Sequence, residues 1–285
     1  MTILYSLPVH ESMDVIVDTV KNINKYSPEN YIIIHVNPDF IEFAAKKLES
    51  FPNVFINPEQ LSFSWGQSLL AIHSSNFQYA KSLSIEFSYV CLFSSNQMFV
   101  THGFNQHVKN FSAGVQILPA KTHYKKTLVS NPRFKAFMKR NKLSSIYKGH
   151  WEGSFYSLEL FETLTNAIEK FYDAGTHELH LEEFVYPMLI KKLCKKEDIS
   201  SPACYMEIGV HPALEKVSLR IIELIRQRSP KLVIKGKISA SKAANFKRLV
   251  FNNRHIYQCR SQLFMIKRVD RTMDNPIRVF INNLD

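Results

Sequence analysis

The first 60 residues alternate between short apolar runs and amphipathic stretches, and this alternation constrains the fold more than any other feature of the chain. The apolar runs predict buried strands over residues 2–7, 31–36 and 53–56. Apolar residues at helical spacing after Ser12, and a proline suited to a first helical position at Pro38, predict a helix in each gap. This order predicts an α/β fold with a doubly wound, mostly parallel sheet and flanking helices.

The carboxyl ends of the strands are the usual ligand-binding edge of such a sheet. We therefore expect the site in the loops after Leu7, Val36 and Phe93, the last of which ends a strong strand predicted over residues 86–93. Further elements are expected as a helix over 64–81, a weak strand over 115–118, a strand over 155–158, and helices over 161–172, 183–193 and 212–228. Residues 119–150 are basic and polar and are expected to form an irregular, mobile insertion.

The positive charge is concentrated toward the C-terminal end of the chain. The formal net charge is +11, and residues 211–285 contain 16 Lys and Arg against 5 Asp and Glu. A segment of this kind binds a polyanion, an anionic membrane or a diphosphate, or it is a solvated basic face without a partner. Glycine is scarce, with 8 residues, which argues against a glycine-rich phosphate-binding loop.

The spacing of the cysteines and the hydropathy of the chain indicate the cellular compartment of the protein. Cys91, Cys194, Cys204 and Cys259 lie far apart without a CxxC pair, which favours reduced and mostly buried thiols. No apolar run approaches the roughly 20 residues of a membrane-spanning helix, and the N-terminus lacks the pattern of a signal peptide. We therefore expect a cytoplasmic protein that can rest on the inner face of a membrane through its basic C-terminal segment.

Several catalytic motifs do not occur in the chain. The sequence contains no GxSxG, HExxH, P-loop or GxGxxG motif. No motif therefore supports a hydrolase, metalloprotease, kinase or dehydrogenase function. Asp-x-Asp does not occur either, and the strong central strand is followed by Ser94, Ser95 and Asn96, whose neutral side chains are poor anchors for a hard cation. We therefore expect no metal and no other cofactor. A bound diphosphate would be neutralised by cationic side chains of the C-terminal segment, such as Arg254, Arg260, Lys267, Arg268 and Arg271.

Three further residues are candidates for a chemical role, and a fourth, His35, is expected in the core. Glu182 and Glu183 begin a predicted helix, where a carboxylate can act as a general base, although acids in a first helical turn also complement the helix dipole. His10 follows the first strand and either contacts a ligand or caps a helix. His35 lies inside an apolar strand and is expected to be a core residue.

Taken in order, several segments resemble the core-2/I-branching β-1,6-N-acetylglucosaminyltransferase family and its bacterial relatives. They are LPVH (7–10) with IHVN (34–37), NVFINPEQLSFSWGQSLL (53–70), YVCLFSSNQMFV (89–100), EGSFYSLEL (152–160) with HLEEFVYPML (180–189), and LFMIKRV (263–269). The resemblance implies a GT-A-like fold, metal-independent transfer from a nucleotide-sugar donor, and inversion at the anomeric carbon.

The same resemblance implies roles for individual residues. Glu183 is expected to be the general base, and Lys267 to bind the diphosphate together with Arg254 or, as the alternative, Arg260. The nucleotide-sugar site is expected to include Pro8, His10, Trp65, Ser68 and Asn96. The acceptor is expected near Trp151 and Glu152.

Residues 1–118 are then expected to form a nucleotide-sugar-binding half, and residues 119–285 an acceptor-binding and catalytic half, of one continuous domain. The predicted reaction moves a sugar, foremost GlcNAc from UDP-GlcNAc, to a hydroxyl of a glycan acceptor, which bacterial surface polysaccharide synthesis presents on a lipid. The alternatives are UDP-galactose, UDP-glucose or a CMP-linked sugar as donor, and a non-catalytic nucleic-acid-binding protein. The last lacks an RNP-like aromatic pair or a helix-turn-helix signature, so we expect no nucleic-acid partner.

Overall fold

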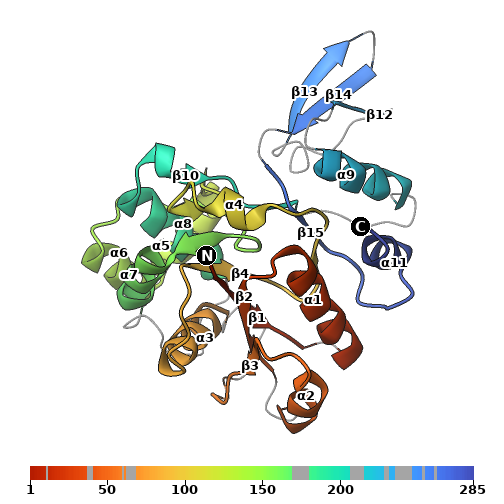
Figure 1. Ribbon diagram of the computed structural model, residues 1–285. Helices are drawn as coiled ribbons and strands as arrows, with labels where there is room; N and C mark the ends of the chain where they lie inside the picture. The colour runs from red at the N-terminus through yellow and green to blue at the C-terminus, as the bar shows by residue number, and fades with distance from the viewer. Residues whose placement is uncertain are drawn as a thin grey trace.

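The computed structural model describes residues 1–10, 12–36, 41–59, 61, 69–168, 180–205, 215–227, 231–234, 246–251, 254–259 and 262–285 (Figure 1). In chain order, the first half contains β1 (Ile3–Pro8), α1 (Met13–Tyr26), β2 (Asn30–His35), α2 (Ile41–Leu48), β3 (Val54–Ile56), α3 (Leu69–Ser82), β4 (Tyr89–Leu92), β5 (Gln97–Phe99), α4 (Phe104–Val108), β6 (Ala113–Gly114) and β7 (Leu118–Pro119). The second half contains α5 (Thr122–Ser130), α6 (Pro132–Arg140), β8 (Tyr147–Lys148), β9 (Phe155–Ser157), α7 (Leu158–Ile168), α8 (Glu182–Leu193), the 3-10 helix η3 (Lys196–Asp198), β10 (Ile199–Ser200), β11 (Cys204–Tyr205), α9 (Glu215–Gln227), β12 (Lys231–Ile234), β13 (Phe246–Phe251), β14 (Arg254–Cys259), β15 (Met265–Lys267) and α11 (Pro276–Asn282).

A seven-stranded sheet lies at the centre of the molecule, in the order β10-β6-β9-β4-β1-β2-β3 (Figure 1). β1 pairs in parallel with β2 and β4, β2 with β3, and β6 with β10, whereas β9 runs antiparallel between β4 and β6. The predicted α/β fold with a doubly wound, mostly parallel sheet is therefore confirmed. The chain moves outward from β1 to β3 and then returns to the other side of β1 at β4, so the carboxyl ends of β1 and β4 flank a topological switch point.

Alternate residues of the central strands serve two separate hydrophobic cores. Leu4 and Ile33 pack with side chains of α3, α7 and α8, whereas Tyr5 and Ile34 pack with α1 and α2. Successive side chains of a strand point to opposite faces of its sheet. The nearly continuous apolar run over residues 31–36 therefore covers both faces, as a strand buried between two helical layers requires.

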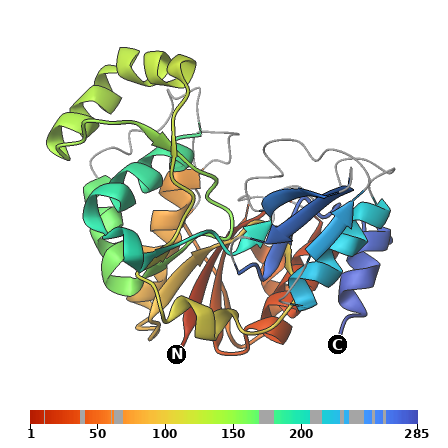
Figure 2. The same cartoon turned by 90° about the horizontal axis from the view of Figure 1, so that it is seen from above.

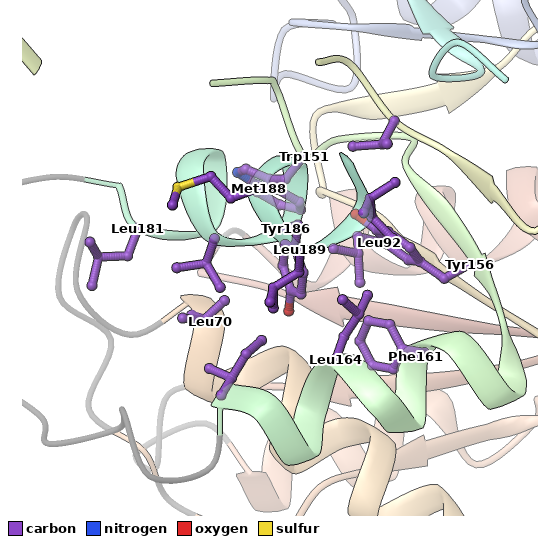
Figure 3. Close-up of a cluster of buried hydrophobic side chains, with 14 of the residues drawn as sticks. Leu70, Leu92, Trp151, Tyr156, Phe161, Leu164, Leu181, Tyr186, Met188 and Leu189 are labelled. Carbon is purple, nitrogen blue, oxygen red and sulfur yellow. The ribbon is translucent and has the colours of Figure 1, made fainter. Parts of the chain in front are cut away.

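Helices α7 and α8 close one of these cores. In Figure 3, Tyr186 and Leu189 of α8 point toward Phe161 and Leu164 of α7, and all four side chains are buried. The rings of Phe161 and Tyr186 are stacked, with centroids 6.1 Å apart. This packing fixes the orientation of α8, whose first turn carries the acidic pair predicted to begin a helix.

A second sheet, in the order β11-β15-β5, supports the C-terminal part of the chain. Met98, Ile266 and the α9 residue Ile222 belong to its hydrophobic core, which α11 completes. Helix α11 is held against α1 by a buried ion pair between Arg278 and Asp18. The last residues of the chain are therefore packed against its first helix.

Residues 119–150 differ from the prediction of an irregular insertion. They contain the helices α5 and α6, and Asn131 caps α6 by accepting hydrogen bonds from the backbone N–H groups of Arg133 and Phe134. The adjacent proline suits the first position of a helix. Leu128, Phe134 and Phe137 are buried between the helices and the main core, so a few apolar residues at helical spacing outweigh the polar composition. The predicted mobility of this region stays a prediction.

Several predicted boundaries are shifted. Helix α7 begins at Leu158, within the strand predicted over 155–158. Of the helix predicted over 64–81, residues 64–68 lie outside the described residues and the rest belongs to α3. The weak strand expected over 115–118 is replaced by the two short strands β6 and β7. Ser12 occupies the N-cap position of α1, but its side chain makes no capping hydrogen bond. The proline expected to begin α2, Pro38, lies outside the described residues.

The predictions for the core and the thiols can be compared directly. His35 is buried, with its Nε2 atom 3.1 Å from the backbone oxygen of Leu61, so its assignment to the core is confirmed. Cys91 and Cys204 are buried free thiols, and Cys194 is a partly buried one. Within the described part of the chain, no helix combines the length and the apolar character that crossing a bilayer requires.

Candidate active site

The switch point between β1 and β4 carries two of the predicted site residues. β1 ends at the buried Pro8, and the chain then reaches the exposed His10. β4 is followed by a tight turn in which the N–H of Gln97 donates to the backbone oxygen of Ser94 at 2.9 Å. The Ser94 hydroxyl donates to the side-chain oxygen of Asn96 at 3.0 Å, which orients that amide. Polar side chains therefore follow both strands at the edge where such sheets bind ligands.

Strand β15 brings Lys267 to the same edge. The antiparallel register of β15 and β5 pairs Lys267 with Gln97, which directly follows Asn96. The backbone N–H of Val269 also donates to the backbone oxygen of Asn96 at 3.0 Å. The structure therefore places Lys267 next to the turn that follows β4, although the two segments are far apart in the sequence.

The other predicted nucleotide-site residues are not brought together in this way. Arg254 begins β14, which lies in the separate sheet β12-β14-β13, and Figure 1 shows this sheet extending beyond α9, away from the central sheet. The side chain of Arg254 is not described, and Arg260, Trp65 and Ser68 lie outside the described residues. Their predicted roles stay predictions.

Lys267 forms an ion pair with Glu152, and both side chains are largely buried, with 16% and 6% of their surface exposed. Oε1 of Glu152 contacts the ammonium, whereas Oε2 is buried without a hydrogen-bond partner among the described residues. The ammonium also lies 5.7 Å from the centre of the Trp151 ring. This loop is held at the end of β4, because the N–H of Gly153 donates to the backbone oxygen of Leu92 at 3.0 Å. Trp151 and Glu152, expected near an acceptor, thus lie beside the lysine expected to bind the diphosphate.

The charge of Lys267 depends on its anionic neighbours. Burial lowers the pKa of Lys267 to about 7, and the positive charges of Arg268 and Arg271 act in the same direction. The carboxylate of Glu152 acts in the opposite direction, because an opposite charge in contact favours the ammonium form. An anion beside Lys267 therefore decides how much of its positive charge is kept near neutral pH.

Glu183 occupies the second position of α8, and its carboxylate is held by a lysine and a histidine. Oε2 lies 2.8 Å from Nζ of Lys148, and Oε1 lies 3.5 Å from Nδ1 of His150. Burial alone would raise the pKa of Glu183, but the hydrogen bonds from His150 and Lys148 outweigh burial and lower it below its usual value. The carboxylate is therefore ionised at neutral pH, the form that a base needs.

A proline inside α8 explains how Lys148 and His150 reach Glu183. Pro187 has no N–H group, so the backbone oxygen of Glu183 lacks its usual partner four residues along the helix. The N–H of Gly149 donates to that oxygen at 2.8 Å instead. Gly149 cannot be replaced without displacement, because a Cβ atom there would lie 1.8 Å from the backbone oxygen of Gln116.

Residues 148–152 therefore connect the two charged groups of the site. Lys148 and His150 contact Glu183, and Glu152 contacts Lys267 a few residues further along the same segment. A shift of this segment would disturb both ion pairs at once.

Glu182, the other acid of the pair, faces inward. Its side chain is 1% exposed and lies 3.5 Å from Nδ1 of His180. Burial raises the pKa of Glu182, although the hydrogen bond from His180 opposes the rise. Of the two acids, Glu183 is the more exposed one and has the lowered pKa, which favours it as the base.

Sequence reasoning missed three residues of the site. Lys148 and His150 lack a local signal, because their contacts with Glu183 join positions far apart in the chain. His73, on α3, packs against the Trp151 ring with centroids 4.9 Å apart, and its Nδ1 lies 2.8 Å from the hydroxyl oxygen of Ser6. Burial lowers the pKa of His73 to about 3, so this ring is a neutral support for Trp151 rather than a proton carrier at neutral pH.

In the part of the chain that the structure describes, no three His, Cys, Asp or Glu side chains are grouped to hold a metal ion. The expectation that the site works without a metal stays a prediction.

No protein-family model matches the chain, and no curated protein matches its sequence. Solved structures with a similar fold include 4-diphosphocytidyl-2C-methyl-D-erythritol synthase from Anaerococcus prevotii, at 10% identity and a TM-score of 0.39, covering 70% of this chain and 84% of that chain. A nucleoside-diphosphate-sugar pyrophosphorylase from Vibrio cholerae matches at 10% identity and a TM-score of 0.41, covering 67% and 88%. S. aureus TarS in complex with UDP matches at 13% identity and a TM-score of 0.31, covering 42% and 36%. All three TM-scores are too low to assign a function to this chain, and membership of the core-2/I-branching family stays a prediction.

Proposed function

We propose that this protein is a glycosyltransferase that moves a sugar from a nucleotide-sugar donor to a hydroxyl of a glycan acceptor, with inversion at the anomeric carbon. The observation that carries the proposal is the segment 148–152, which joins an ionised carboxylate at Glu183 to a buried lysine at Lys267 beside the switch point of the sheet. Nucleophilic displacement of a nucleoside diphosphate by an alcohol is accelerated by these two groups, a base for the hydroxyl and a cation for the leaving group.

In the proposed reaction, Glu183 removes the proton from the acceptor hydroxyl as its oxygen bonds to the anomeric carbon. The bond between that carbon and the diphosphate oxygen breaks, and the electron pair leaves with the nucleoside diphosphate. Lys267 offsets the charge that develops on the diphosphate. The low pKa of Glu183 ensures that the base is deprotonated, at the expense of some driving force for the proton transfer.

Donor binding would exchange the partner of Lys267. In the free protein its ammonium is held by Glu152, whereas a bound diphosphate offers more negative charge and several acceptor oxygens. Because burial lowers the pKa of Lys267 to about 7, the lysine needs an anionic partner to stay protonated at neutral pH, and the diphosphate would supply one. We expect diphosphate binding to need no divalent cation, because the ammonium of Lys267 supplies the positive charge that a cation would otherwise provide.

UDP-GlcNAc is the donor that we propose first, and UDP-galactose, UDP-glucose and CMP-linked sugars are the alternatives. The test is a thermal-shift panel of UDP, GDP, CMP and UDP-GlcNAc, measured in EDTA and again with Mg²⁺ or Mn²⁺. A ligand at about 100 times its dissociation constant stabilises the fold by about 2.7 kcal/mol, which is readily measured.

The proposal predicts stabilisation by UDP and UDP-GlcNAc in EDTA that Lys267→Met abolishes. Lys109→Met, which removes an exposed lysine on the loop after α4, is the matched control and should leave the shift unchanged. No response to any nucleotide, or a response that requires the metal, would contradict the proposed function.

A further inference from the structure

The helical pair α5–α6 carries an unusual concentration of positive charge. Residues 119–150 contain nine Lys and Arg and no Asp or Glu, and no acidic residue occurs anywhere between Glu86 and Glu152. This second basic region is separate from the C-terminal excess of charge. Lys148 is paired with Glu183, whereas the exposed lysines of this region lie where a partner or solvent ions can reach them.

The fold turns these charges outward. Phe134 and Phe137 of α6, and Leu128 of α5, point into the core and anchor the pair. The exposed side chains form what we call the basic face: Lys121, Lys125, Lys126, Arg133, Lys135, Lys139, Arg140 and Lys142. Figure 2 shows the pair, in yellow-green, standing out from the body of the molecule at its edge, where a large flat partner can approach it.

The chemistry of the basic face fits a surface better than a single small ligand. Six of its eight charges are lysines, which are separate point charges on flexible stems and lack the fork that fixes one phosphate in place. Two large apolar side chains lie exposed in the same region, Val129 on α5 and Leu118 just before it, with 41% and 49% of their surface open to solvent. Lysine clusters beside exposed apolar side chains are typical of segments that lie on anionic bilayers.

We infer that the basic face docks this protein on an anionic lipid surface. The negative headgroups supply counter-charge to the exposed lysines of this face, and Val129 and Leu118 meet the boundary between headgroups and acyl chains. A nucleic-acid backbone would neutralise the lysines but would offer no apolar layer to these two side chains. The inference is independent of the proposed function, because it concerns binding in the absence of any donor.

Docking at this face would place the candidate base close to the bilayer. The ring of Tyr124, on α5, lies 5.6 Å from that of Phe184, the neighbour of Glu183, and the ammonium of Lys148 lies 4.5 Å from the centre of the Tyr124 ring. The basic face and Glu183 therefore belong to one contiguous part of the molecule. An acceptor carried by a lipid would be presented on that side.

The test is sedimentation of the full-length protein with large vesicles of phosphatidylcholine, with and without phosphatidylglycerol, in the absence of nucleotides. We expect binding to the anionic vesicles only, and loss of that binding near 1 M salt, where the Debye length falls to about 3 Å. Replacing Lys125, Lys126 and Lys135 by Gln should weaken partitioning by about 100-fold. These side chains are exposed, so the melting temperature of the variant should match that of the wild type.

The matched control replaces the exposed Lys21, Lys46 and Lys109 by Gln, which removes the same net charge from other parts of the surface. It should change partitioning by less than about threefold, since charges beyond a Debye length of the membrane are screened. Equal binding to neutral and anionic vesicles would overturn the inference. So would an equal loss in both triple variants, or a basic-face variant that loses duplex DNA binding while its vesicle binding is unchanged.

Discussion

Removing Lys267 should leave the buried carboxylate of Glu152 without its ion-pair partner, and the resulting loss of stability follows from the structure. Glu152 is 6% exposed at its side chain, its Oε1 contacts Lys267, and its Oε2 has no hydrogen-bond partner among the described residues. Lys267→Met would leave this charge buried and uncompensated, which costs about 3–5 kcal/mol in comparable buried pairs. Glu152→Gln should cost less, about 1–2 kcal/mol, because the ammonium left behind can lose its proton near a pKa of about 7.

The double variant removes both charges and should be within about 2 kcal/mol of the wild type, since buried pairs are often replaceable by uncharged groups. The cycle therefore predicts a coupling of about 3 kcal/mol between the two sites. The assay is urea unfolding of all four proteins at pH 7, with the slope of the transition checked for constancy. Additive effects, within about 0.5 kcal/mol, would refute the reasoning that the two side chains form a buried ion pair.

Three further predictions follow from the same residues and their neighbours. The affinity for UDP should weaken between pH 7 and 9, approaching tenfold per pH unit, because burial lowers the pKa of Lys267 to about 7 and the lysine loses its charge over this range. In calorimetric titration, the affinity of Lys267→Arg should not change with pH, because the guanidinium keeps its charge. The folded-state pKa of His73, about 3, lies below its ordinary value, so the unfolded chain takes up the proton first as the pH falls. Stability measured by urea unfolding should therefore fall by about 1.6 kcal/mol between pH 6.5 and 5, and His73→Phe should not show this loss. Gly149→Ala should lower the free energy of unfolding by about 1–3 kcal/mol and reduce transfer activity, because the added Cβ atom would overlap the backbone oxygen of Gln116. An unchanged melting temperature would show that residues 148–152 are not held as described.

The central sheet could be predicted from the sequence because its signals are local. The apolar run over residues 31–36 is too continuous for a half-exposed strand and too short for a helix, and its parallel pairing with β1 is what the order strand–helix–strand predicts. Lys267 and Asn96 are both expected in the nucleotide-sugar site, on the resemblance of two segments to a family and not on any pattern of spacing, whereas their adjacency comes from the pairing of β15 with β5. The roles of both residues stay predictions.

Other features depend on contacts that no local pattern encodes. The polar stretch over 119–150 contains two helices because Asn131 caps α6 and three apolar residues anchor the pair, a signal too sparse to outweigh the lysines around it. The partners of Glu183 cannot be predicted from the sequence, because they come from a distant segment. Gly149 of that segment donates to the backbone oxygen of Glu183 in place of the N–H group that Pro187 lacks. A proline within a helix identifies the free carbonyl group, but it does not indicate which segment will bind it.

The central claim is that Glu183 is the base of a sugar transfer, and the most direct test is the rate of UDP release from UDP-GlcNAc in the presence of glycan acceptors. Glu183→Gln should reduce this rate by about 10²–10⁴-fold while its affinity for UDP stays at the wild-type value. Glu159→Gln, on the exposed side of α7, is the control and should retain the full rate. A Glu183→Gln protein that turns over within about threefold of the wild type would contradict the account.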